Sequence, residues 1–151
     1  MRKITPFLWF DTQAEEAMNF YISLFKNSKV LGVTRGPDGR ALSVSFQLEE
    51  QEFMAYNAGP EFKFNEAISF FVDCKTQAEV DALWQKLSEG GEESRCGWVK
   101  DKFGLWWQIV PTVLGEMLQD KDAVKAKRVM DAMLNMSKLD TALLRRAYAQ
   151  E

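Results

Sequence analysis

An internal repeat constrains the fold of this chain more than any other feature of its sequence. Residues 7–25 read FLWFDTQAEEAMNFYISLF, and residues 70–88 read FFVDCKTQAEVDALWQKLS. Each copy contains an apolar, strand-like run closed by an aspartate, then a short turn, the letters TQAE, and a segment with apolar residues at helical spacing. A unit that recurs in this way predicts two similar structural modules.

Both copies predict a helix directly after the turn. Thr12 with Glu15, and Thr76 with Glu79, have the spacing of a capping box, in which the threonine accepts from the third helical N–H and the glutamate reaches back to the cap. One apolar stripe follows each box. The stripes are Ala17, Met18, Tyr21, Leu24 and Phe25 in the first copy, and Val80, Leu83, Trp84 and Leu87 in the second.

Strand-like stretches follow each predicted helix. They cover 29–34, 41–48 and 52–57 after the first helix, and 92–100 and 105–111 after the second, where a further strand near Glu93–Cys96 is less clear. The pattern predicts an α+β fold in which two βαβββ modules form a mixed sheet rolled around a cavity, with the helices outside. The modules cover about 1–60 and 65–111 and form one domain over 1–111.

Residues 112–151 form a C-terminal helical extension in this prediction. They carry no strand signal, and they divide at Ser137 into two amphipathic helices. The predicted apolar stripe consists of Val129, Met130, Met133, Met136, Leu139, Leu143 and Ala147. Such a stripe must be buried, so we expect a homodimer in which residues 121–150 form or brace the interface.

Charge and composition exclude several classes of protein. Residues 1–120 have a net charge of −6 and residues 121–151 a net charge of +3, and an acidic body with a pI near 5.2 argues against a nucleic-acid partner. No apolar run reaches the ~20 residues of a membrane-spanning helix, and Asp11 comes too early for a secretory signal. We therefore expect a cytoplasmic protein without a membrane partner, in which Cys74 and Cys96 are free thiols.

Several motifs resemble the PhnB-like, demethylubiquinone methyltransferase-like branch of the vicinal oxygen chelate superfamily, which includes glyoxalases, bleomycin-resistance proteins and dioxygenases. The motifs are ITPFLWFD (4–11), AEEAMNFY (14–21), FMAYNAGPEFKFNEAISFFVDC (53–74), EVDALWQKLSEGG (79–91), CGWVKDKFGLWWQIVP (96–111) and AMLNMSKLD (132–140). The resemblance implies the paired-module fold over about 1–111 and a helical tail over 112–150.

The resemblance also implies where a divalent metal would be bound. The ligands of the superfamily are His, Gln or Glu on the first and last strands of each module. The matching positions here are Thr5 (or Pro6), Phe53 or Ala55, Ala67 and Gln108, and only Gln108 is a residue of ligand type. The chain has no histidine, and a metal site needs about three or four donors. We therefore predict no metal and no cofactor.

The name of the branch implies methyl transfer. The common fold that uses S-adenosylmethionine has a glycine-rich turn between its first strand and first helix. No G-x-G precedes the first predicted helix, and Gly90–Gly91 follows a helix. The sequence therefore does not predict a binding site for this cofactor.

The alternation of side chains along strands identifies candidate ligand-binding residues. The cavity-facing candidates are Thr5, Phe7, Trp9, Asn57, Ser69, Phe71, Trp98, Trp106 and Gln108. An apolar wall with a few polar anchors is typical of a small-molecule site, although the same aromatic residues could simply fill a core. The alternative function is a metal-independent enzyme with Tyr56, Cys96, Asp101 or Lys102 as candidate groups; no catalytic residue is assigned.

Overall fold

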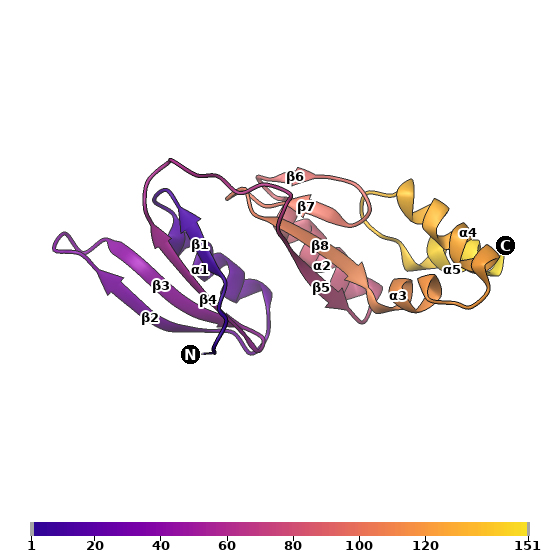
Figure 1. Cartoon of the computed structure of the whole chain (residues 1–151), viewed down its shortest axis with the longest axis horizontal. Helices are drawn as coiled ribbons and strands as arrows, with labels where there is room; N and C mark the ends of the chain where they lie inside the picture. The colour runs from indigo at the N-terminus through magenta and orange to yellow at the C-terminus, as the bar shows by residue number, and fades with distance from the viewer. Residues whose placement is uncertain (1, 151) are drawn as a thin grey trace. The chain divides into compact units, whose positions relative to one another are not determined.

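The computed structural model describes residues 2–150, which form two compact units. The first unit ends at Lys63 and the second begins at Phe64. Figure 1 shows the order of the elements along the chain. Each unit contains one four-stranded mixed sheet, so the α+β class and the two modules are confirmed. Neither sheet closes into a barrel by itself, and rolling of the two sheets around one cavity stays a prediction.

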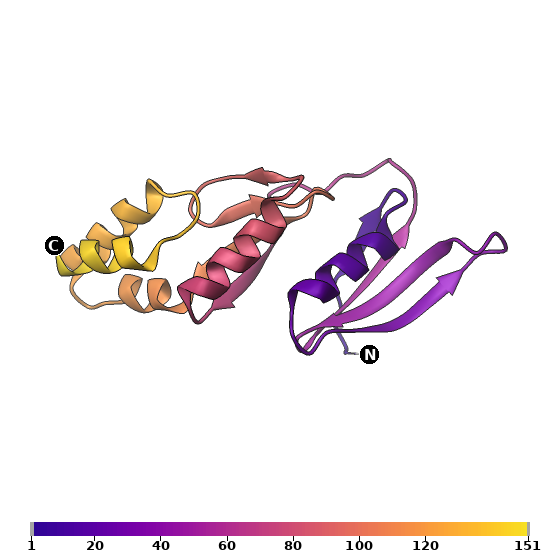
Figure 2. The same cartoon turned by 180° about the vertical axis from the view of Figure 1, so that it is seen from behind.

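The first unit is a β-α-β-β-β module. Its strand order is β1-β4-β3-β2, with β1 parallel to β4 and the other pairs antiparallel. The elements are β1 (Phe7–Phe10), α1 (Ala14–Leu24), β2 (Lys29–Arg35), β3 (Ala41–Leu48) and β4 (Gln51–Asn57). Helix α1 lies against one face of this sheet (Figure 2). Met18 and Tyr21 of the helix are buried, as are Leu8 and Phe10 of β1, because alternate strand residues point toward the helix.

The second unit repeats this arrangement with strand order β5-β8-β7-β6. Its elements are β5 (Ser69–Cys74), α2 (Gln77–Ser88), β6 (Glu92–Glu93), β7 (Trp98–Lys100) and β8 (Trp106–Pro111). The predicted stripe of α2 is confirmed, since Val80, Leu83, Trp84 and Leu87 are all buried.

The predicted strand over 92–100 is interrupted in the structure. Cys96 and Gly97 have φ angles of +58° and +84°, which no extended strand contains. The chain turns there and separates β6 from β7. A left-handed conformation at a non-glycine residue gives no clear signal in the sequence, so the break was not predicted.

The extension forms three helices, and the prediction of two was wrong. They are α3 (Thr112–Leu118), α4 (Ala123–Leu134) and α5 (Thr141–Ala149). We call residues 112–150 the tail. Its core joins the second module, because Val110 of β8 belongs to the same buried cluster as Leu114, Met117, Val129, Leu139 and Leu144. The predicted stripe is shifted at α5, where Leu144 is buried and Leu143 is 45% exposed.

The two capping boxes differ in outcome. Thr76 caps α2 as predicted, with its Oγ1 accepting from the N–H of Glu79, although the Glu79 carboxylate accepts from the N–H of Lys75. Thr12 does not cap α1: the N-cap residue is Gln13, and its own side chain makes no capping hydrogen bond. No helix in the described part of the chain is long and apolar enough to span a membrane.

Candidate functional site

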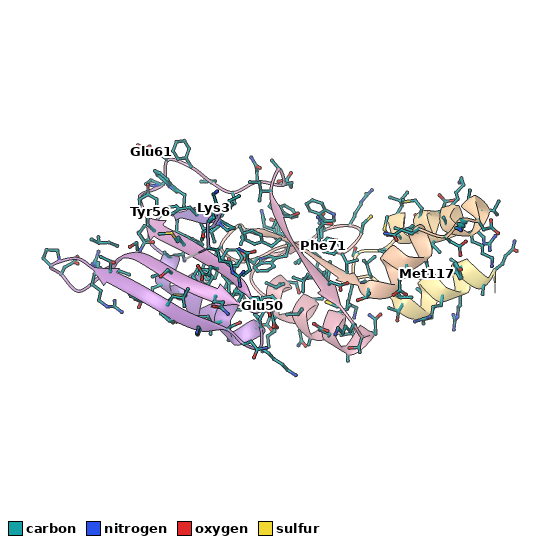
Figure 3. All side chains as sticks on the ribbon, turned by 60° about the horizontal axis from the view of Figure 1, so that its bottom comes forward. Lys3, Glu50, Tyr56, Glu61, Phe71 and Met117 are labelled. Atoms are coloured by element: carbon teal, nitrogen blue, oxygen red, sulfur yellow. The ribbon has the colours of Figure 1, made fainter. Side chains whose placement is uncertain are left out.

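A row of three side chains crosses the open face of the second sheet. The register pairs Gln108 of β8 with Phe71 of β5 on one side and with Trp98 of β7 on the other. The sequence neighbours of Gln108 on β8, Trp107 and Ile109, are buried on the opposite face. The row therefore presents one amide between two aromatic rings on the face away from α2. Figure 3 shows where Phe71 lies on β5 and where Met117 lies on α3.

The amide of Gln108 is held in place within the sheet. Its Nε2 donates to the Oγ of Ser69, one row away, at 2.9 Å. Because a serine hydroxyl both donates and accepts, the Gln108 amide can turn either its oxygen or its NH₂ toward a bound molecule. Ser69 thus positions Gln108, and it does not itself line the cavity described next.

A cavity of about 460 Å³ lies over this row. We call it the tail cavity. Its sheet side is formed by Phe71, Asp73, Trp98, Gln108 and Val110. Its opposite side is formed mainly by apolar residues of the tail, namely Leu114 and Leu118 of α3 and Met133 of α4. The site therefore depends on the tail as much as on the module.

The sequence analysis missed the contribution of the tail and of Asp73. The contribution of the tail could have been found from the sequence, because no linker separates β8 from the amphipathic segment after Pro111. A helix that follows a strand directly must pack near that strand. Asp73 has the same strand parity as Ser69 and Phe71, which was the signal for this residue. Its carboxylate accepts a hydrogen bond from the Thr112 hydroxyl at 2.8 Å.

A loop of the tail is attached to the module next to the cavity. The N–H groups of Cys96 and Gly97 donate to the carbonyl oxygens of Met136 and Ser137, both at 2.8 Å. From the N-terminus of α2, the Gln77 side chain donates to the Leu139 carbonyl at 2.9 Å and accepts from the Thr141 N–H at 2.8 Å. These four bonds hold α4 and α5 against the second module.

The candidates of the first unit form an aromatic cluster of their own. Tyr56 makes edge-on contacts with Phe7 and Trp9, at centroid distances of 4.9 and 5.4 Å, and Trp9 contacts Phe62 in the same way. The Trp9 indole donates to the Gly59 carbonyl, and the Thr5 hydroxyl donates to the Arg2 carbonyl. These residues of the first unit do not line the tail cavity, whose lining residues belong to the second unit.

Asn57 has a structural role in the first unit. Its Oδ1 accepts from the N–H of Ala14 at 2.9 Å, and its Nδ2 donates to the carbonyl of Ala41 at 3.1 Å. The residue thereby satisfies a free N–H in the first turn of α1, the place where Thr12 was expected to act. Since both ends of its amide are already bonded, we do not assign Asn57 to a ligand site.

Trp106, another predicted site residue, lies outside the tail cavity lining. It is half-buried in the row before Gln108, beside Ser69 and Lys100 in the register. Its ring contacts Trp98 edge-on, and the Lys100 ammonium lies 5.9 Å from its centroid. Trp106 thus supports Trp98 from the side.

The predicted turn charges have structural roles. Asp101, a candidate group of the alternative enzyme, is 1% exposed, and its carboxylate accepts from the N–H groups of Phe103 and Leu105 and from the Trp107 indole. The Lys102 ammonium lies 5.4 Å from the Phe103 ring. These contacts stabilise the turn before β8, so neither residue is placed in the tail cavity.

The two cysteines differ in environment. Burial is the main cause that raises the pKa of the Cys74 thiol, and together with the negative charges of Glu79 and Asp73 it brings this pKa to about 12. Cys74 is therefore an unreactive core residue at neutral pH. Cys96 is partly exposed and lines the tail cavity.

The residues do not fit the metal site of the superfamily. Of the matching positions, Thr5, Ala55, Ala67 and Gln108, only the last offers a strong donor. Nowhere between residues 2 and 150 do three His, Cys, Asp or Glu side chains lie close enough together to hold a metal ion. The matching positions thus supply one side chain of ligand type, whereas a divalent metal needs about three or four donors.

Comparison with known proteins identifies the family. A family model described as 3-demethylubiquinone-9 3-methyltransferase matches residues 2–110. This chain belongs to that family. Its members include the PhnB protein from Bacillus cereus, whose solved structure has a TM-score of 0.69 and 35% identity over 73% of this chain and 99% of that one. The resemblance to the PhnB-like, demethylubiquinone methyltransferase-like family is confirmed.

More distant structures share the fold alone. A protein from Pseudomonas aeruginosa has a TM-score of 0.61 at 18% identity, over 74% of this chain and 98% of that one. A gene product from Arabidopsis thaliana has a TM-score of 0.51 at 19% identity, over 71% and 96%. A search of curated proteins found no match.

The tail lies outside the part of the chain that matches the family model. That match ends at residue 110, and α3 begins at Thr112. The tail side of the cavity is therefore built from residues beyond the family match, whereas Phe71, Trp98 and Gln108 lie within it.

Proposed function

We propose that this member of the 3-demethylubiquinone-9 3-methyltransferase family binds a small, largely apolar molecule in the tail cavity, without a metal ion. One observation carries the proposal: the row Phe71–Gln108–Trp98 lies at the base of a cavity of about 460 Å³. This volume is in the range of small-molecule sites, which combine apolar walls with a few fixed polar groups. The Gln108 amide is the central polar group.

Binding is favoured over methyl transfer by the connections between strands and helices. The family name refers to a methyltransferase. In the two modules, residues 11–13 connect β1 to α1 and residues 75–76 connect β5 to α2, and neither connection contains glycine. The common fold that uses S-adenosylmethionine has a glycine-rich turn between its first strand and first helix, and neither connection provides one. We therefore propose a binding protein.

The homodimer and the cytoplasmic location also remain proposals. We expect a dimer because the apolar stripe of the tail must be buried, but much of this stripe is already buried within the second unit. Four large apolar side chains of α4 and α5 remain 39–65% exposed, namely Val124, Met130, Leu134 and Leu143. Sedimentation equilibrium of the full chain tests the dimer, and a monomer at all concentrations contradicts it.

The binding proposal is tested with 2-phenylethanol, a neutral molecule with one aromatic ring and one hydroxyl. We expect saturable binding in the presence of EDTA, with a dissociation constant of about 1 mM, or about 4 kcal/mol. Phe71→Ala and Gln108→Leu should each weaken binding about tenfold, or about 1.4 kcal/mol. Phe7→Ala is the matched control, because Phe7 and Phe71 are 53% and 60% exposed on the first strands of their modules.

Two outcomes contradict the proposal. The first is an absence of saturable binding by the wild-type protein. The second is equal weakening by Phe7→Ala and Phe71→Ala, which would show that binding is not located in the tail cavity.

A further inference from the structure

We propose that the molecule bound in the tail cavity is an amine with an apolar or aromatic body, and that the Asp73 carboxylate binds its ammonium group. This inference rests on the proposed function. It assigns the chemical class of the ligand, and it makes Asp73 the residue that determines specificity.

The position of Asp73 matches such a ligand. Asp73 follows Phe71 by two residues on β5, so both side chains lie on the open face of the sheet. Two strand residues correspond to about 6.6 Å along the sheet. A ring lying over Phe71, Gln108 and Trp98 therefore places an ammonium group on a two-carbon spacer near the next row, where Asp73 lies.

The charge of the cavity favours a cation over an anion. Asp73 is the one charged side chain among the described residues that line the tail cavity. The basic side chain nearest to Asp73 in the register is Lys100, which lies in the row of Trp106, on the other side of the Gln108 row. Its ammonium forms an ion pair with Glu92 at 3.3 Å. An organic anion would meet a carboxylate in the cavity without a basic partner.

A neighbouring group supports a negative potential at this end of β5. Burial is the main cause of the raised pKa of the Cys74 thiol, and the charges of Glu79 and Asp73 add to it. Like charges disfavour a thiolate, and the same charges favour a bound cation. The aromatic faces of Phe71 and Trp98 add a favourable surface for a cationic ligand.

The existing bond of Asp73 leaves it able to bind a ligand. Oδ1 accepts from the Thr112 hydroxyl at 2.8 Å. A carboxylate has about four lone-pair sites on its two oxygens, so an ammonium group can bind without displacing Thr112. The hydroxyl instead fixes the direction of the carboxylate at the start of α3.

The test compares 2-phenylethylamine, 2-phenylethanol and phenylacetate, which share a ring and differ in charge. We expect the amine to bind about two- to five-fold more tightly than the alcohol, the range of a partly exposed ion pair, and phenylacetate to bind most weakly. Asp73→Asn should remove the preference for the amine, because it keeps the acceptor for Thr112 and removes the charge. Asp11→Asn, which removes a carboxylate directly after β1 in the first unit and outside the tail cavity lining, should leave the preference unchanged.

Salt provides a check that needs no variant. At about 1 M salt the Debye length is about 3 Å, so the preference for the amine should shrink while binding of the alcohol persists. Equal binding of amine and alcohol by the wild type, or a preference that survives in Asp73→Asn, overturns this inference and leaves the proposed function standing. If none of the three probes binds, the proposed function fails, and this inference fails with it.

Discussion

Replacement of Gly97 by alanine tests the attachment of the tail to the second module. Gly97 has a φ of +84°, its N–H donates to Ser137 of the tail loop, and its carbonyl accepts from the Ile109 N–H of β8. A Cβ at this position would lie 2.8 Å from the Ile109 oxygen and 2.9 Å from Cδ1 of Leu139. Leu139 is fully buried, so it has no free space into which to move.

The expected cost has two parts. A positive φ at a residue with a Cβ costs about 1–2 kcal/mol. Forcing an additional carbon into a packed region costs about 1–3 kcal/mol more. Gly97→Ala should therefore lower the free energy of unfolding by about 2–5 kcal/mol.

Gly104→Ala is the matched control. Gly104 has a φ of +91°, and a Cβ there would meet no described atom within 4 Å. It should therefore cost only the backbone part, about 1–2 kcal/mol. The difference between the two variants isolates the close contact between β7, β8 and the tail loop.

Urea unfolding followed by tryptophan fluorescence measures both variants. The signal reports mainly on the second unit, which contains four of the five tryptophans: Trp84, Trp98, Trp106 and Trp107. With an unchanged slope, a lower midpoint reports a loss of stability. Equal losses for the two variants would refute the contact between Gly97 and the tail.

Three further predictions follow from the same structure. Gln77→Ala should lower the free energy of unfolding by about 1–3 kcal/mol, because it leaves the Leu139 carbonyl and the Thr141 N–H without their partner. Gln85→Ala, at an exposed position on the same helix, should lower it little, and equal urea midpoints for the two variants would contradict this role of Gln77. Trp84→Ala should lower the free energy of unfolding by about 3–5 kcal/mol, because Trp84 is 4% exposed and its indole is bonded to Glu93. Trp106→Ala should lower it less, because Trp106 is half-buried, and equal losses of stability in urea would mean that Trp106 is packed as tightly as a core residue. The raised pKa of Cys74 favours the protonated thiol in the folded state, so the stability that this thiol contributes is complete below about pH 9 and is lost as the pH rises to about 12. If a Cys74→Val variant loses the same stability over this pH range, the loss does not come from Cys74.

The module architecture could be predicted from the sequence because its signals are local and occur twice. The stripe Val80–Leu83–Trp84–Leu87 predicted the buried face of α2, and the alternation around Gln108 predicted its place opposite Trp107 and Ile109. Both patterns depend only on helix and strand geometry.

The errors arose where one specific side-chain partner, rather than the periodicity of a helix or strand, determines the structure. Asp101 reads as a solvated turn residue, and its burial depends on the Trp107 indole six residues later. The cap of α1 comes from Asn57, which is 43 residues away from Ala14. No local pattern distinguishes such partners.

The tail shows the same limit at the site itself. Its amphipathic pattern predicted that one face would be buried, but not that this face would pack on β8 and form one side of the cavity over Phe71, Trp98 and Gln108. The pattern also predicted two helices divided at Ser137, which lies in the turn at 135–140, but it missed the turn at 119–122 that separates α3 from α4. The sequence therefore predicted Phe71, Trp98 and Gln108 of the sheet side of the candidate site, but not the contribution of the tail.

The spectrum of the five indole N–H groups, recorded by ¹H–¹⁵N NMR during a titration with 2-phenylethanol, tests the binding proposal most directly. Trp98 lines the tail cavity, whereas the indoles of Trp9 and Trp84 are bonded to Gly59 and Glu93. We predict that the Trp98 signal moves in a saturable manner while the signals of Trp9 and Trp84 stay in place, and that Phe71→Ala reduces the movement. A saturable shift of Trp9 with an unmoved Trp98 would contradict the proposed site.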